Sequence, residues 1–244
     1  NLGISKETYE VLEDSYIIRG IEVKKSQLEK IAKDKRNNVW ALLSDNELLK
    51  LLFFEGKVYK LRIVKPSTAP TLEINGIHMH RIVGTTPWED AKSKVKVLRV
   101  KNKRVLDICT GLGYTAIHAM RLGAKEVITI ERDLNVLKIA QFNPWSKGLE
   151  NIRILVGDAT HLIKSLPAES FDRVMHDPPR EGLARELYSR PFYSQIFRIL
   201  KQGGIVFHYV GQPGVKRGLE LWKHIKKRME HVGCLLYTSP SPRD

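Results

Sequence analysis

The stretch Val105-Leu-Asp107-Ile-Cys-Thr-Gly111-Leu-Gly113-Tyr-Thr-Ala116 decides the fold. It predicts an apolar strand that ends in an acidic residue, then a loop with two glycines, then the start of a helix. Because glycine has no Cβ, Gly111 and Gly113 let the backbone approach a bound molecule closely. This order is typical of open parallel sheets that bind ligands at the carboxyl ends of their strands.

Outward from this stretch, the sequence alternates between strands and helices from about residue 99. The expected strands span 104–109, 126–130, 152–156, 171–176 and 204–210. The expected helices lie near 114–122, 134–143, 160–165, 190–201 and 216–231. Such alternation, with right-handed crossovers, predicts an α/β fold with a doubly wound, mostly parallel sheet.

Residues 1–98 predict a small accessory region of mixed α and β structure. The β-branched stretch Ser15–Val23 predicts one strand, and a short helix follows from Ser26. Asn75-Gly76 lies between two strand-like runs and predicts a type I′ hairpin over residues 71–82. Thr86 and Pro87 predict the start of the next helix.

Length and composition exclude several classes of protein. The 244 residues suffice for one sizeable α/β domain with a small additional module. No run of 18 apolar residues predicts a membrane span, and the amino-terminal residues do not resemble a signal peptide. Two cysteines exclude a disulfide scaffold and a cysteine-based zinc site, so we expect a reducing, cytoplasmic location.

The chain is strongly basic, with a formal net charge of +14 and a pI near 9.7. Such a charge favours polyanions as partners, nucleic acid first among them. The alternative is a solvated, lysine-rich surface. The basic residues are densest within 216–228.

The last eleven residues, 234–244, resemble one reading frame of translated sequencing adapter. We interpret them as not native and exclude them from the fold. On this interpretation Cys109 is the only natural cysteine, and the last strands of the sheet are missing.

Two cofactors compete for the glycine loop. Residues 111–116 fit the dinucleotide pattern G-x-G-x-x-A, with Glu131 twenty residues after Gly111. Asp107, however, would repel a pyrophosphate, whereas it can meet the ammonium of S-adenosyl-L-methionine (SAM). We therefore favour SAM over NAD and over an ordinary strand–loop–helix turn. The expected contacts in this motif are Asp107, Thr110, Gly111, Gly113, Tyr114 and Thr115.

Acidic residues also end the next two strands. Glu131 can accept hydrogen bonds from both ribose hydroxyls, and Asp158 can accept one from an adenine amine. The alternative for each is a surface acid or a helix cap, and we assign capping to Asp133. Arg132 and Ala159 complete the expected cofactor site.

The fourth strand ends in His176-Asp177-Pro178-Pro179-Arg180. The two prolines predict a rigid, extended turn that presents backbone carbonyls and Asp177 to the acceptor. Methyl transfer is an in-line displacement, so positioning supplies most of its catalysis. A carboxylate here can also hold or deprotonate an amine. We predict Asp177, Pro178, Pro179 and Arg180 as the catalytic residues; the alternative is a tight surface turn.

Three further residues, His80, His176 and Tyr209, are expected to line the acceptor side. His208 and Tyr209 end the fifth strand, and one of them points into the crevice or the core. His78 and His80 share one face of a hairpin strand. Two histidines without a third ligand do not predict a metal site, and we expect no metal.

In order and spacing, these four motifs resemble the class I SAM-dependent methyltransferases. Residues 72–233 resemble a largely uncharacterised archaeal methyltransferase group, and they also resemble spermidine synthases, which share the fold and use decarboxylated SAM. The hairpin from Leu72 to Ile82 is similar to theirs too. The resemblance is carried by Asp177–Leu183, Glu186–Ser189, Phe192-Tyr193 and Gly204–Gly211. It implies a SAM-binding domain over 99–233.

The chain departs from related patterns at two positions. Cys109 stands where the loop usually has its first glycine, and Arg180 stands where nucleic-acid amino methylases carry an aromatic residue. Asp-Pro-Pro-Arg is also similar to RNA 5-methyluridine enzymes. Those enzymes need a later cysteine, and here only Cys234 follows, so we reject that chemistry unless a missing carboxyl-terminal segment supplies the thiol.

Three functions follow. The first is methyl transfer from SAM to a heteroatom of nucleic acid, with RNA favoured. The second is a small-molecule transferase acting on an amine, including aminopropyl transfer as in spermidine synthases. The third is a SAM- or RNA-binding module without chemistry. The sequence does not predict an oligomeric state.

Overall fold

The chain forms two compact units, seen here in a computed structural model that describes residues 2–5, 7–210 and 215–234. The first unit comprises Asn1–Ser93, Gly111–Tyr114 and Asp133–Glu150. The second comprises Lys94–Thr110, Thr115–Arg132 and Asn151–Asp244. No helix within the described residues is both long and apolar enough to cross a membrane. The adapter-like residues 235–244 lie outside the described part of the chain.

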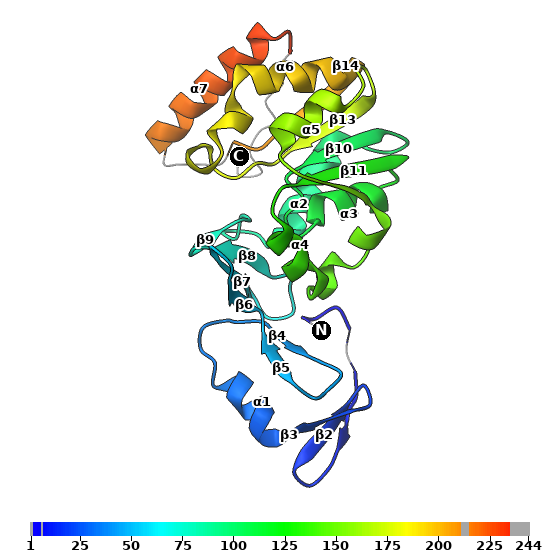
Figure 1. Cartoon of the computed structure of the whole chain (residues 1–244), viewed down its shortest axis with the longest axis vertical. Coiled ribbons are helices and arrows are strands. Elements are labelled where there is room, and N and C mark those ends of the chain that lie inside the picture. Colours follow the sequence, from blue (N-terminus) through cyan, green and yellow to red (C-terminus); the bar gives the residue numbers. More distant parts are fainter. Residues whose placement is uncertain (1, 6, 211–214, 235–244) are drawn as a thin grey trace. The chain divides into compact units, whose positions relative to one another are not determined.

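The second unit contains the parallel sheet (Figure 1). Its strands are β10 (Arg104–Ile108), β11 (Glu126–Glu131), β12 (Arg153–Val156), β13 (Phe171–His176) and β14 (Leu200–His208). They lie in the order β12-β11-β10-β13-β14, and all neighbouring pairs are parallel. The α/β prediction is thus confirmed. The strand order reverses between β10 and β13, and ligands bind at such a switch point.

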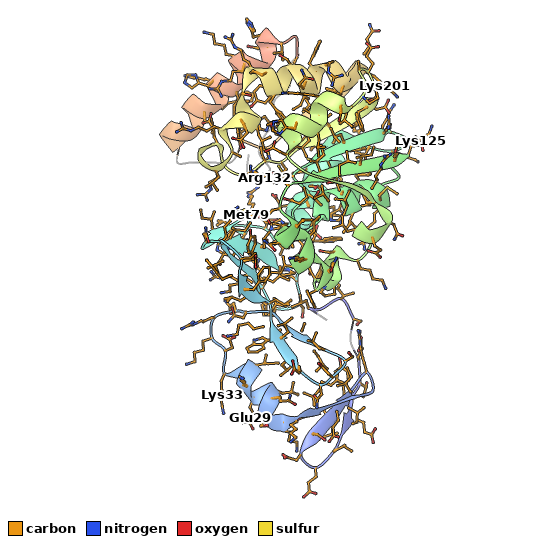
Figure 2. The ribbon with its side chains drawn as sticks, in the orientation of Figure 1. Glu29, Lys33, Met79, Lys125, Arg132 and Lys201 are labelled. Atoms are coloured by element: carbon orange, nitrogen blue, oxygen red, sulfur yellow. The ribbon has the colours of Figure 1, made fainter. Side chains whose placement is uncertain are left out.

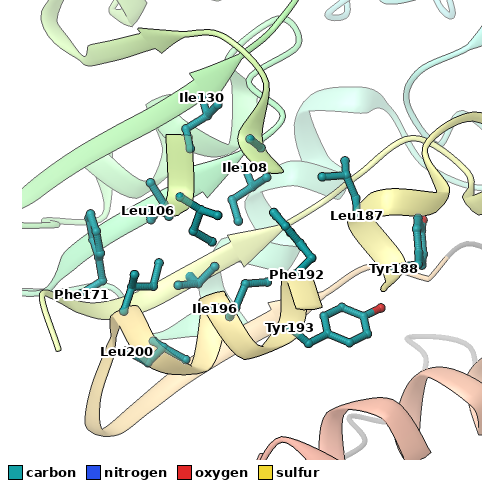
Figure 3. Close-up of a cluster of buried hydrophobic side chains, with 14 of the residues drawn as sticks. Leu106, Ile108, Ile130, Phe171, Leu187, Tyr188, Phe192, Tyr193, Ile196 and Leu200 are labelled. Atoms are coloured by element: carbon teal, nitrogen blue, oxygen red, sulfur yellow. The ribbon is translucent and has the colours of Figure 1, made fainter. Parts of the chain in front are cut away.

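Helices α5 (Ala159–Ser165) and α6 (Arg190–Ile199) pack against one face of this sheet. Right-handed crossovers place α3 (Tyr114–Arg121), which connects β10 and β11, on the opposite face. Figure 3 shows the core between the sheet and α6, where Leu106, Phe171 and Ile196 are fully buried. Helix α7 (Val215–His231) adds Ile225 and Met229 to the same core. This packing holds β10 and β13 side by side.

The first unit is built from antiparallel strands. A three-stranded sheet has the order β1-β2-β3, β4 pairs with β5, and a four-stranded sheet has the order β6-β7-β8-β9. Helix α4 packs against β7, and the Tyr59 hydroxyl donates to Asp133 Oδ2 at 2.6 Å. The bounds are β1 Glu10–Val11, β2 Ser15–Ile18, β3 Ile21–Lys24, α1 Lys25–Ala32, β4 Trp40–Leu42, β5 Leu48–Lys50, β6 Leu52–Phe54, β7 Val58–Arg62, β8 Thr71–Ile74, β9 Ile77–His78, α2 Pro87–Leu98 and α4 Leu134–Gln141.

The predicted single strand Ser15–Val23 is wrong, because the chain turns within it. Arg19 and Gly20 have φ angles of 53° and 79°, so the stretch forms the hairpin β2–β3. The predicted hairpin turn at Asn75-Gly76 is confirmed, with φ angles of 49° and 78°. Thr86 caps α2 as expected, since its Oγ1 accepts a hydrogen bond from the Glu89 amide at 3.3 Å.

Candidate active site

Asp107, the acidic residue near the end of β10, is buried, with 1% of its surface exposed. Its Oδ2 accepts a hydrogen bond from Thr129 Oγ1 at 2.7 Å, and the Thr115 side chain also bonds the carboxyl group. Its Oδ1 has no hydrogen-bond partner among the described residues. Burial raises the pKa of Asp107 to about 7. A buried carboxylate oxygen without a donor fits a cationic, hydrogen-bonding ligand group such as an ammonium.

Cys109 has a φ of 74°, in the left-handed region where glycine is favoured. The observation accounts for the glycine that related loops carry at this position. Burial raises the pKa of the Cys109 thiol well above its usual value, so the thiol stays protonated and is a poor nucleophile. Next to it, buried Thr110 shares a 2.6 Å hydrogen bond with Thr129. The bond between Thr110 and Thr129 connects the end of β10 to β11.

The two loop glycines have different surroundings. Gly111 and Gly113 have φ angles of 55° and 79°. A Cβ on Gly113 would lie 2.8 Å from Leu149 Cδ1, whereas a Cβ on Gly111 would meet nothing within 4 Å. Gly113 is thus required for packing, and Gly111 leaves its backbone open on the side where a side chain would stand. This openness suits close approach by a ligand.

Tyr114 and His80 lie within the packed part of the first unit. The Tyr114 hydroxyl donates to the Pro70 carbonyl at 2.9 Å and accepts from Asn143 Nδ2 at 2.8 Å. The His80 ring packs on Tyr114 with 5.2 Å between centroids, and its Nδ1 shares a hydrogen bond with Thr71. The Tyr114 side chain is therefore engaged within the protein, and its predicted cofactor contact would have to come from the backbone.

At the end of β11, Glu131 is buried, with 8% of its surface exposed. Arg132, the next residue, is exposed, and its Nη1 lies 3.9 Å from Asp158 Oδ2 and 3.5 Å from Glu186 Oε1. Asp133 caps α4, since its Oδ1 accepts from the Asn135 amide at 3.0 Å. The capping role predicted for Asp133 is confirmed.

Asp158 caps α5 at the end of β12. Its Oδ1 accepts from both the amide and the hydroxyl of Thr160, at 2.8 and 2.6 Å. Ala159, the first residue of the helix, is buried. The helix-cap interpretation of Asp158 therefore holds, and it uses only one carboxylate oxygen. The second oxygen is the one that faces Arg132 and that could accept from an adenine amine.

At the end of β13, Asp177 belongs to a cluster that the sequence analysis missed. Lys94 Nζ donates to Asp177 Oδ2 at 2.7 Å, and the same ammonium lies 3.9 Å from the centroid of the Tyr209 ring. The Lys94 and Asp177 side chains are only 10% and 23% exposed. Lys94 shares the buried face of α2 with Ala91 and Leu98. Asp90, one turn earlier, is buried on the same face, and this pair of charged residues among apolar ones was the signal available in the sequence.

The proline turn after Asp177 is anchored to the core. The Tyr188 hydroxyl donates to the Pro179 carbonyl at 2.9 Å, and Pro178 is buried. Arg180 is exposed and precedes a short 3-10 helix over Glu181–Leu183. Of the four predicted catalytic residues, the prolines therefore fix the chain, while Asp177 and Arg180 present charged groups.

His176 does not line an open surface, contrary to expectation. It is 0% exposed, its Nε2–H donates to the Leu187 carbonyl at 3.0 Å, and its ring packs 4.3 Å from that of His208. Burial lowers the pKa of His176 to about 4, so the ring is neutral at neutral pH. The alternation of side chains along β13 turns His176 toward α6 and leaves Asp177 to face the other way. His208 also faces the core, through a 3.0 Å hydrogen bond with Tyr193.

Comparison with known proteins assigns the family. Residues 99–238 match a family model described as "Methyltransferase domain". The chain is also 49% identical over 210 residues to uncharacterized protein MJ1233 of Methanocaldococcus jannaschii, which covers 84% of this chain and 71% of that protein. The chain belongs to this methyltransferase family. It is accordingly an enzyme that uses SAM.

More distant relatives act on different acceptors. The chain is 27% identical over 165 residues to putrescine N-methyltransferase 2 of Nicotiana attenuata, covering 64% of this chain and 44% of that protein. It is 33% identical over 100 residues to the 23S rRNA (uracil(1939)-C(5))-methyltransferase RlmD of Xanthomonas axonopodis, covering 40% and 22%. The chain thus spans less than half the length of either relative.

A solved structure shares the fold over most of the chain. Spermidine synthase in complex with the transition-state analogue AdoDATO has a TM-score of 0.62 and 17% identity. The match covers 83% of this chain and 75% of that structure. At this level of identity the likeness establishes the fold alone.

Proposed function

We propose that the chain transfers the methyl group of SAM to a nitrogen or oxygen atom of an RNA. The observation that carries this proposal is the Lys94–Asp177–Tyr209 cluster at the carboxyl end of β13. It places a carboxylate, which can take up a proton, in an ion pair with a nearly buried ammonium. The net charge of +14 favours the same class of acceptor.

The residues at the strand ends fit SAM. Asp107 offers a buried oxygen without a donor, which suits the ammonium of the methionine end. Glu131 is a buried carboxylate that suits the two ribose hydroxyls, and Asp158 keeps one oxygen for the adenine amine. We assign Thr110, Gly111, Gly113, Thr115, Arg132 and Ala159 to the walls of the same site. When bound, SAM supplies a methyl group on a positively charged sulfur.

Asp177 is suited to hold the acceptor. A nucleophilic N–H or O–H group can donate a hydrogen bond to its carboxylate and lose its proton to it as the new bond to the methyl carbon forms. Lys94 fixes the carboxylate through a 2.7 Å hydrogen bond, and the proline turn fixes the chain that follows. Positioning of this kind accounts for a large share of the rate in bimolecular reactions.

Lys94 distinguishes between acceptor classes. Its ammonium offsets the charge of Asp177, so the cluster as a whole offers no net negative charge to a polyamine. A polyamine therefore gains little Coulomb energy at the pair, because its attraction to Asp177 is offset by its repulsion from Lys94. The cluster therefore argues against putrescine and similar amines, and the net charge of the chain is what favours RNA.

The second candidate function is transfer to a small amine. It is supported by the similarity to putrescine N-methyltransferase and by the fold shared with spermidine synthase. In this case Asp177 would bind the amine, and Lys94 would have to move away from it.

Isotope transfer separates the two candidates. The full chain is incubated with tritium-labelled SAM and either an unfractionated RNA pool or putrescine. We expect label in RNA, a loss of about a hundredfold or more in Asp177→Asn, and a smaller loss in Lys94→Met. Glu181→Gln, which changes a half-buried acid bonded to Arg228, serves as the matched control.

The Lys94→Met variant gives the contrary result if the acceptor is an amine. If label appears only in putrescine, and if Lys94→Met increases it, then the acceptor is an amine and not RNA. If Asp177→Asn transfers label as fast as the parent chain, Asp177 does not take part in the reaction.

A further inference from the structure

A groove in the first unit has no part in the methyl-transfer site described above. It has a volume of about 470 Å³ and is lined by residues of α1, the segment after it, and the β4–β5 hairpin. The lining residues that matter here are Glu29, Lys30, Lys33, Asp34, Trp40 and Lys50. Figure 2 labels Glu29 and Lys33, which lie on α1 and at its end. None of the six is among the predicted catalytic or cofactor residues.

Trp40 is held in a fixed orientation in this groove. Its indole N–H donates to Asp34 Oδ2 at 3.2 Å, and Asn38 Nδ2 donates to the same oxygen at 2.7 Å. Trp40 is directly opposite Lys50 in the β4–β5 hairpin, and Lys50 Nζ lies 4.8 Å from the centroid of the indole ring. An aromatic ring anchored in this way loses little conformational freedom when another ring stacks on it.

The groove also carries an excess of positive charge. Its two acids are each close to a lysine, Glu29 to Lys33 at 3.3 Å and Asp34 to Lys50 at 3.8 Å. Lys30 has no carboxylate within 4 Å in the described part of the chain. The surrounding segment from Lys24 to Arg36 contains six basic and two acidic residues. Lys30 and Lys33 are exposed, so they can reach an anion at the groove.

We propose that this groove binds a nucleotide of single-stranded RNA, with its base against Trp40 and its phosphates near Lys30 and Lys33. A fixed aromatic ring beside cations is the combination that binds single strands, because every base can stack and every phosphate is anionic. The proposal rests on the proposed function only for its choice of RNA as the polymer. The groove would then hold the acceptor RNA at a second point, outside the residues that act on the methyl group.

Anisotropy of a labelled ten-nucleotide single-stranded RNA tests the phosphate contacts on the full chain. We expect Lys30→Gln/Lys33→Gln to weaken binding and to reduce the slope of log affinity against log salt by about 1.4, or about 0.7 for each lost phosphate contact. The control is Lys101→Gln/Lys125→Gln, which removes the same charge from the turns before β10 and β11; Lys125 is labelled in Figure 2. We expect this control to keep the parent slope to within about half a unit.

Substitution of Trp40 tests the stacking contact separately. We expect Trp40→Leu to weaken RNA binding about 5- to 150-fold, and Trp40→Phe to retain most of the affinity because the phenyl ring still stacks. Circular dichroism shows whether each variant is folded. Trp40→Phe keeps the proposal testable if Trp40→Leu does not fold, because the RNA-induced quenching of tryptophan fluorescence must then decrease although binding persists.

The outcomes separate this proposal from the function itself. If the chain binds and methylates RNA and all groove variants bind like the parent, the groove proposal is overturned and the function stands. If the groove variants weaken RNA binding but label goes only to an amine, the groove stands and the RNA acceptor is overturned. Binding of a polyglutamate peptide in preference to RNA would overturn the groove proposal.

Discussion

At the scale of single residues, the backbone at position 109 limits which side chains are tolerated. A φ of 74° is disfavoured for L-residues, most of all for β-branched ones, and Cys109 stands at this angle. We expect Cys109→Val to lower the free energy of unfolding by about 2 kcal/mol. Cys109→Gly should stay within about 1 kcal/mol of the parent, because relief of strain offsets the lost packing. Urea denaturation measures both, and equal stabilities of the two variants would contradict the assignment.

The two roles of Asp158, as the cap of α5 and as a contact to adenine, can be tested separately. The cap of α5 needs an oxygen that accepts from the Thr160 amide, which asparagine also supplies. We therefore expect Asp158→Asn to keep the parent stability, and Asp158→Ala to lose about 1 kcal/mol. Both should bind SAM about tenfold more weakly if the second oxygen accepts from adenine. Unchanged SAM affinity in Asp158→Asn would leave Asp158 as a helix cap only.

The site residues that could be recognised from the sequence are those at the ends of strands. Asp107 and Glu131 lie at the ends of β10 and β11, Asp158 and Asp177 come just after β12 and β13, and a parallel sheet must bring such ends to one edge. Lys94 had no such pattern around it, because its position beside Asp177 depends on how α2 packs. His176 was misassigned because the pattern located the strand end without giving the direction of each side chain.

At the scale of elements, the adjoining strands β13 and β14 bury two neutral histidines side by side. Burial lowers the pKa of His176 from 6.5 to about 4, and it lowers that of His208 well below its usual value. Between pH 4 and 6.5 the unfolded chain therefore binds more protons than the folded chain. The contribution of these histidines to stability is present above pH 6.5 and is lost as the pH falls toward 4.

We expect this loss to reach about 3 kcal/mol for His176 between pH 7 and pH 4. His176→Gln keeps a donor for the Leu187 carbonyl and removes the titration, so its stability should fall less over the same range. Asp107, whose pKa is raised, makes the folded chain more stable as the pH falls, in both the variant and the parent. Subtracting the free energies of unfolding of the two chains at each pH, measured by urea denaturation, removes this shared contribution. Parallel pH profiles would mean that His176 is not neutralised by burial.

Strand and helix positions in the sheet could be predicted to within a few residues, since apolar runs, glycines and caps all agree there. The hairpin β2–β3 could not be recognised from its composition, because its turn uses Arg19 in a left-handed conformation. Likewise β14 begins at Leu200, four residues before the predicted start at Gly204. The conformations of residues in turns, more than the strand propensities, limited how accurately the strand ends could be predicted.

At the scale of the whole molecule, the fold and the family follow from the motifs of the sequence, whereas the strand pairing of the first unit does not. Its short strands carry weak periodicity, so their pairing depends on contacts between distant residues. The excess of positive charge lies mainly in the second unit, which has 24 basic and 12 acidic residues against 17 and 15 in the first, and attraction of RNA is expected to weaken steeply with salt. Binding of SAM should respond less, since it depends on the buried acids at the strand ends.

The central claim is that the carboxyl ends of the sheet bind SAM, with Asp107 facing its ammonium. Calorimetric titration of the full chain with SAM at pH 6.5, in two buffers of different ionisation enthalpy, tests it most directly. Because the pKa of Asp107 is about 7, the ammonium should displace its proton on binding, and we expect release of about 0.5–0.8 proton per SAM. Asp107→Asn should bind at least about tenfold more weakly and release none. Absence of SAM binding, or equal binding without proton release in both chains, would contradict the account.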